Sequence, residues 1–61
     1  MTPEKIRKAP SAKALNAMLP DYAAVVSSAP RLWTVQIDGE AKGFPEPFTD
    51  ARERMATLFE A

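Results

Sequence analysis

The positions of proline constrain this chain more than any other feature of its sequence. Six of its 61 residues are proline, at positions 3, 10, 20, 30, 45 and 47. Proline lacks a backbone N–H, and its ring clashes with the carbonyl four residues earlier, so a proline inside a helix costs about 3 kcal/mol. The sequence therefore predicts short elements that begin or end near a proline.

Three segments separated by prolines are expected to be helical. Thr2 and Ser11 are suitable N-caps, for a short helical turn over residues 3–8 and for a helix over residues 11–18, and Pro3 suits the first helical position. The apolar spacing of the second helix continues past Pro20, which predicts a further helix over residues 20–28 that Pro20 opens. Leu15, Met18, Leu19, Tyr22, Val25 and Val26 form this stripe. The stripe exceeds what one strand can cover and suggests a partner surface.

A last helix is expected over residues 51–60. Asp50 and Glu53 have the spacing of a capping box, in which an N-cap acceptor is followed three residues later by Glu. The apolar residues of this helix share one face. They are Ala51, Met55, Leu58 and Phe59.

After Pro30 the apolar pattern changes from the helical period to a period of two. Trp33, Val35 and Ile37 alternate with the other residues of the segment, which predicts a strand over residues 31–37 with these three facing the core. Asp38-Gly39 is a strong turn signal, and a short return strand is expected near residues 42–44. The expected fold class is α+β, a single small domain over residues 1–61 with a two-stranded antiparallel hairpin, in the order α-α-β-β-α.

Length and charge suggest that this domain associates. The large apolar residues, Phe44 included, supply a small core for a chain without disulfides, and self-association or a partner would extend the burial. The charge is uneven although the net charge is zero. Residues 1–13 are basic and residues 31–61 are acidic, and residues 1–10 are interpreted as a flexible basic segment. Such a bipolar surface suits a protein partner or a second copy.

The absence of His and Cys removes the imidazole base, the thiolate nucleophile, the disulfide and the soft metal site. Only carboxylates remain for catalysis, and Lys42 stands where a calcium-binding loop would need an oxygen ligand. The clustered acids are interpreted as helix caps and solvated surface. They are Asp38, Glu40, Glu46, Asp50 and Glu53. We expect no enzymatic activity, no catalytic residue, no cofactor and no metal.

A small winged-helix-like DNA-binding transcriptional regulator is the alternative function, because helices followed by a hairpin have that order. Its recognition helix would be residues 20–28, which contain no Lys or Arg and place Asp21 toward the DNA. The basic residues lie near the N-terminus instead, where they would give weak, salt-sensitive contacts to phosphates. They are Lys5, Arg7, Lys8 and Lys13. Nucleic acid is therefore not the expected partner.

The function predicted from the sequence is that of a small, non-enzymatic regulatory protein that acts by protein–protein interaction, with a homodimer as one form of it. Small chains of this kind are often encoded by phages and mobile elements, which suggests an inhibitor of a host protein or defence factor. The candidate partner-binding residues combine apolar anchors with an acidic border. They are Tyr22, Val26, Leu32, Asp38 and Glu40.

The expected location is the cytoplasm, and the host cytoplasm if the protein is viral. The first residues lack the apolar core of a signal peptide, and no apolar run approaches the 18 or so residues that span a bilayer. No membrane association is expected.

Overall fold

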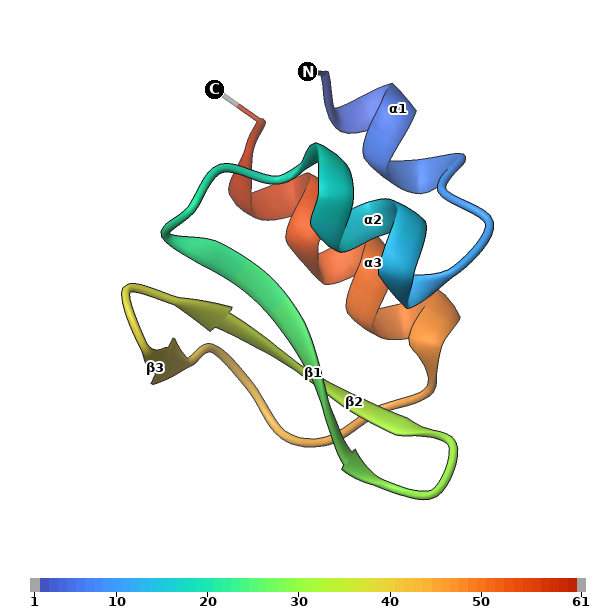
Figure 1. Ribbon diagram of the computed structural model, residues 1–61, viewed down its shortest axis with the longest axis vertical. Helices are drawn as coiled ribbons and strands as arrows, with labels where there is room; N and C mark the ends of the chain where they lie inside the picture. Colours follow the sequence, from blue (N-terminus) through green and yellow to red (C-terminus); the bar gives the residue numbers. More distant parts are fainter. Residues whose placement is uncertain (1, 61) are drawn as a thin grey trace.

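The computed structural model describes residues 2–60, which form three helices and one antiparallel sheet with the strand order β1-β2-β3. All three helices lie on one side of the sheet (Figure 1). Helix α2 packs on β1, α3 packs on β2, and α1 packs on α3. This arrangement confirms the α+β class. The elements are α1 (Pro3–Arg7), α2 (Ala12–Met18), β1 (Ala23–Ala29), β2 (Leu32–Ile37), β3 (Glu40–Ala41) and α3 (Phe48–Leu58).

The predicted helix over residues 20–28 is wrong, because this segment contains β1. The segment carries two adjacent β-branched valines and two serines, which favour a helix less than the alanines beside them do. Pairing decides the outcome: Val25 lies opposite Val35 and Val26 lies opposite Thr34 in an antiparallel ladder with β2. The supposed apolar stripe is therefore divided between a helix and the two faces of a strand, and the winged-helix alternative loses its recognition helix.

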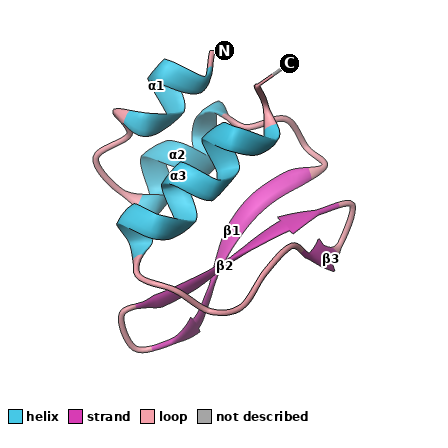
Figure 2. Cartoon of the chain, turned by 180° about the vertical axis from the view of Figure 1, so that it is seen from behind, coloured by secondary structure: helices cyan, strands magenta, loops and turns pink. Residues whose placement is uncertain are grey.

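The predicted return strand also needs correction, because β3 begins directly after Asp38-Gly39 rather than at residue 42. Both turn residues have positive φ, 54° and 80°, as a two-residue hairpin turn requires. Glu40 therefore pairs at once with Ile37. The strand ends after Ala41, and the following residues, 42–47, run alongside β2 toward α3 (Figure 2).

Helix α3 begins at Phe48, three residues before the predicted start, and no side chain caps it. The capping-box prediction at Asp50 is therefore wrong. Pro47 has φ −55°, close to helical values, and its carbonyl accepts the N–H of Ala51 at 2.9 Å. The Phe48 ring packs edge-on against Trp33, with 6.2 Å between ring centroids, and this contact fixes the first turn.

The two N-terminal helices are capped as predicted. Thr2 Oγ1 accepts the N–H of Lys5 at 3.3 Å, and Ser11 Oγ accepts the N–H of Ala14 at 3.2 Å. The side chain of Ile6 in α1 is fully buried against the rest of the core. The basic N-terminal residues thus belong to a packed helix. Within residues 2–60, no helix has the length and hydropathy needed to cross a membrane.

The core lies between the sheet and the helices, and β2 faces it as predicted. Val35 is fully buried, and Trp33 and Ile37 pack against the same cluster. The last helix departs from the predicted stripe at one position, since Leu58 is 47% exposed while Ala56 is buried. The buried apolar residues are Ile6, Ala9, Leu15, Leu19, Ala23, Val25, Val35, Ala51, Met55 and Ala56.

Candidate functional site

Three of the five predicted partner-binding residues lie at one end of the hairpin. The N–H of Asp38 donates to the carbonyl of Tyr22 at 2.7 Å, so the start of β1 and the end of β2 are joined there. Glu40 begins the return strand in the same turn. The Tyr22 ring is half exposed and lies 6.4 Å from the ring of Phe59 at the end of α3.

The other two predicted residues, Val26 and Leu32, lie on the face of the sheet that points away from the helices. Side chains alternate along a strand, and the odd-numbered residues of β2 face the core, so the even-numbered ones face outward. Val26 pairs with Thr34, and Leu32 stands two residues before Thr34. We call this surface the outer face. Its residues in β1 and β2 are Ala24, Val26, Leu32, Thr34 and Gln36. The structure thus divides the five predicted residues between two surfaces.

Phe44 is the most exposed large apolar side chain of the described residues, at 87% exposure. It was expected among the large apolar side chains that supply the core. The nearby Pro45 and Pro47 were the available signal: both lack an N–H, and a strand through them could not pair regularly. Phe44 instead lies in residues 42–47, which we call the Phe44 loop.

Backbone hydrogen bonds on both sides of Phe44 hold the Phe44 loop to β2, along the part of that strand's edge that the short β3 leaves unpaired. Before it, the N–H of Lys42 donates to the carbonyl of Val35 at 2.8 Å. After it, Trp33 and Glu46 exchange two hydrogen bonds, of 2.7 and 2.9 Å. Pro45 and Pro47 further restrict the backbone. Phe44 therefore projects from a loop whose two ends are fixed.

A side-chain ion pair attaches the same loop to α3. Arg54 Nε donates to the Glu46 carboxylate at 2.8 Å, and this bond raises the pKa of the Arg54 guanidinium above its ordinary value. Gly43 adopts φ 133°, and a Cβ there would stand 2.9 Å from Arg54 Nε. Glycine thus allows the arginine to pass close to the loop backbone.

A groove of about 430 Å³ lies beside the loop, along the exposed side of α3. Three carboxylates and one guanidinium line it, together with the half-exposed Leu58. The described residues contain no group of three His, Cys, Asp or Glu side chains arranged to hold a metal ion. Its lining residues are Glu46, Asp50, Glu53, Arg54, Thr57 and Leu58.

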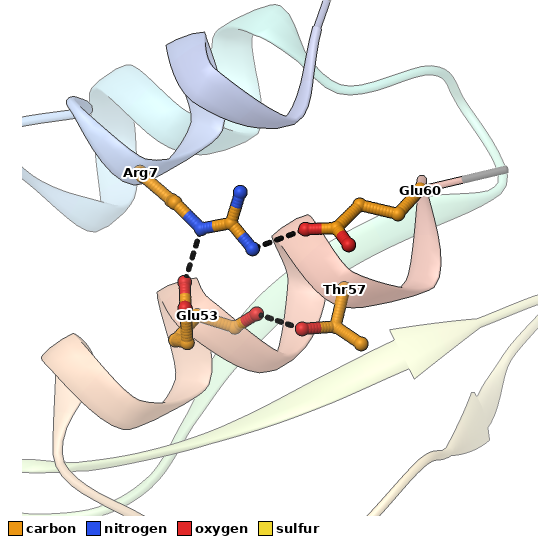
Figure 3. A network of polar contacts seen from close by, with 4 residues as sticks. All are labelled: Arg7, Glu53, Thr57 and Glu60. Carbon is orange, nitrogen blue, oxygen red and sulfur yellow. Dashed lines mark hydrogen bonds and ion pairs between the residues drawn. The ribbon is translucent and has the colours of Figure 1, made fainter.

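The acids of the groove are partly neutralised by α1 (Figure 3). Arg7 Nε donates to Glu53 at 2.5 Å and its Nη2 donates to Glu60, and both bonds raise the pKa of the Arg7 guanidinium. The hydroxyl of Thr57 donates to the carbonyl of Glu53 at 3.0 Å. The raised pKa keeps the Arg7 guanidinium protonated, so both pairs persist for as long as the two carboxylates are ionised.

Comparison with protein-family models, with curated proteins and with solved structures finds no match for this chain.

Proposed function

We propose that this chain is a non-enzymatic regulatory protein that acts by binding another protein, and that Phe44 is its main anchor. One observation carries the proposal: a phenylalanine that is 87% exposed on a loop fixed at both ends. Full burial of such a side chain on binding contributes about 1.5–3 kcal/mol. Because the loop backbone is held at both ends, binding has to order the Phe44 side chain but not the loop, so much of that contribution remains as affinity.

The surroundings of Phe44 suit the border of a protein interface. Leu58 adds a second exposed apolar side chain, and the acids of the groove supply polar contacts around it. Interfaces commonly combine a few apolar anchors with a polar border. A partner with an apolar pocket for Phe44 and basic residues opposite the groove fits this surface. Occlusion of such a partner, as by a small inhibitor, is the mode of action that we propose.

Site-specific photo-crosslinking in the cells from which the sequence derives tests the proposal. A photoreactive phenylalanine analogue at position 44 should link the chain to one predominant protein. The same group at Ala17, an exposed residue of α2, should not link to that protein, because α2 lies over β1 and the Phe44 loop borders β2.

A quantitative test uses the purified partner. Phe44→Ala should weaken binding about 30-fold or more, the effect of losing an anchor worth about 2 kcal/mol. The unfolding midpoint should be unchanged, because this side chain is exposed. Equal crosslinking from positions 44 and 17, or unchanged affinity of Phe44→Ala, would contradict the proposal.

A further inference from the structure

The outer face of the sheet carries an apolar surface on the side opposite all three helices (Figure 2). Ala24, Val26 and Leu32 are only partly buried there. Thr34 lies among them at 6% exposure, and its hydroxyl is hydrogen-bonded to that of Ser28. The Thr34 hydroxyl at the centre of this face therefore already has a hydrogen-bond partner. Another apolar surface can cover it without leaving an unpaired polar group.

The two ends of the hairpin carry opposite charges. Arg31 occupies the turn between β1 and β2, and Asp38 occupies the turn between β2 and β3. Glu40, which follows this second turn, is already paired with Lys42 at 3.4 Å, so Asp38 is the acid to consider at this end. Within residues 2–60, neither Arg31 nor Asp38 takes part in an ion pair. The two residues are seven positions apart along an extended chain, which corresponds to about 23 Å at roughly 3.3 Å per position.

From this charge pattern we infer that two copies of the chain associate through their outer faces, with their hairpins antiparallel. A two-fold axis at the middle of the face would place Arg31 of each copy near Asp38 of the other. Sheets that pack face to face lie about 10 Å apart and within about 30° of alignment, a geometry that long side chains at the ends can bridge. The contact is isologous, so both ends form the same ion pair.

A second copy fits this face because the pattern is complementary to itself. The net charge of zero gives two copies no overall repulsion, and a parallel stack would place like charges together. The two long strands of the hairpin offer about 220 Å² of flat area per copy, from a strand spacing of about 4.8 Å and the length above, and β3 adds little because it is short. Stable complexes bury about 800 Å² per partner, so the dimer belongs to the weak class and the end charges fix its orientation.

The turn that holds Arg31 has an unusual backbone conformation. The φ of Arg31 is 65°, in the left-handed region where glycine or asparagine is the less strained choice. The chain thus keeps a cation at this turn in a conformation that arginine rarely adopts. The outer face and the Phe44 loop have no residue in common, so substitutions at Arg31 and Asp38 test the dimer and leave the Phe44 anchor of the proposed function unchanged.

Sedimentation equilibrium of the full chain tests the inference. At low salt and about 1 mM protein, a concentration suited to a weak complex, the wild type should contain dimers. Arg31→Glu and Asp38→Lys should each raise the dissociation constant about tenfold, because two attractive contacts become repulsive. Lys13→Glu, an equal charge change on α2, should leave the dissociation constant unchanged. Circular dichroism establishes that each variant is folded, and Asp38→Asn, which retains the turn preference, replaces Asp38→Lys if that variant unfolds.

Rescue by charge exchange distinguishes the antiparallel dimer from other associations. An equimolar mixture of Arg31→Glu and Asp38→Lys should recover wild-type affinity, as should one chain carrying both substitutions, because every end contact is again between opposite charges. With Asp38→Asn, the expected result is a weaker dimer that Arg31→Glu does not rescue. A monomer at about 1 mM, a dimer insensitive to these reversals, or a failure of the mixture to recover would overturn the inference.

Discussion

The side-chain amide of Asn16 hydrogen-bonds to the backbone of β1, as a neighbouring strand would. Replacing Asn16 is therefore the most informative stability test. Its Oδ1 accepts the N–H of Val25 at 2.8 Å, and its Nδ2 donates to the carbonyl of Val25 at 3.0 Å. Each such bond contributes about 0.5–1.5 kcal/mol, so Asn16→Ala loses about 1–3 kcal/mol. Alanine returns about 0.5 kcal/mol through its higher helix propensity. Water can reach the freed groups because Asn16 is exposed. We expect a net loss of about 0.5–2 kcal/mol.

Urea unfolding followed by the fluorescence of Trp33 measures this loss directly. Lys13→Ala is the matched control, because Lys13 lies on the same helix and makes no hydrogen bond to β1 among the described residues. Asn16→Asp should destabilise at least as much as Asn16→Ala, since it places a carboxylate oxygen against the Val25 carbonyl and loses the donor. An Asn16→Ala variant as stable as Lys13→Ala would refute the reasoning.

Two further substitutions test the core and the loop. Met55→Ala should lower the free energy of unfolding by about 2–5 kcal/mol, because Met55 is fully buried. Leu58→Ala, on the exposed side of the same helix, should change it by less than about 1 kcal/mol. Similar shifts of the two variants in calorimetry would contradict the burial assigned to α3. Gly43→Ala should lower it by about 1–3 kcal/mol, because the residue has φ 133° and a Cβ would displace Arg54 from Glu46. Thermal unfolding checks that value, and an unchanged midpoint would show that the loop adapts.

The fold could be predicted where local signals and tertiary contacts agree. Thr2 and Ser11 cap the first two helices as expected, and the alternation through Trp33 and Val35 gives the correct facing of β2. β1 could not be predicted in the same way. Its apolar spacing fits a helix and a strand equally, and the deciding contacts come from β2 and from Asn16, nine residues earlier than Val25 in the chain.

The candidate site was less predictable than the fold, because exposure depends on packing that the sequence does not specify. Phe44 and Phe48 are both flanked by proline, yet Phe48 packs on Trp33 while Phe44 is solvent-exposed. The difference arises from the two hydrogen bonds between Trp33 and Glu46, which lie far apart in sequence. Val26 and Leu32 were predicted as partner residues, and their common face depends on the strand over residues 23–29, a segment that the sequence suggested was helical.

The packing of α1 on α3 joins the earliest described helix to the last one. Arg7 bonds to Glu53 and Glu60, which are 46 and 53 residues away, and Ile6 is buried in the same region. Closing so long a loop has a high entropic cost, so these contacts should form late in folding. A cut in the chain between the two helices would turn this contact into an association of two fragments. The continuity of the chain therefore contributes to stability by itself. Proteolysis of the turns at Arg31 or Asp38 should remove this contribution.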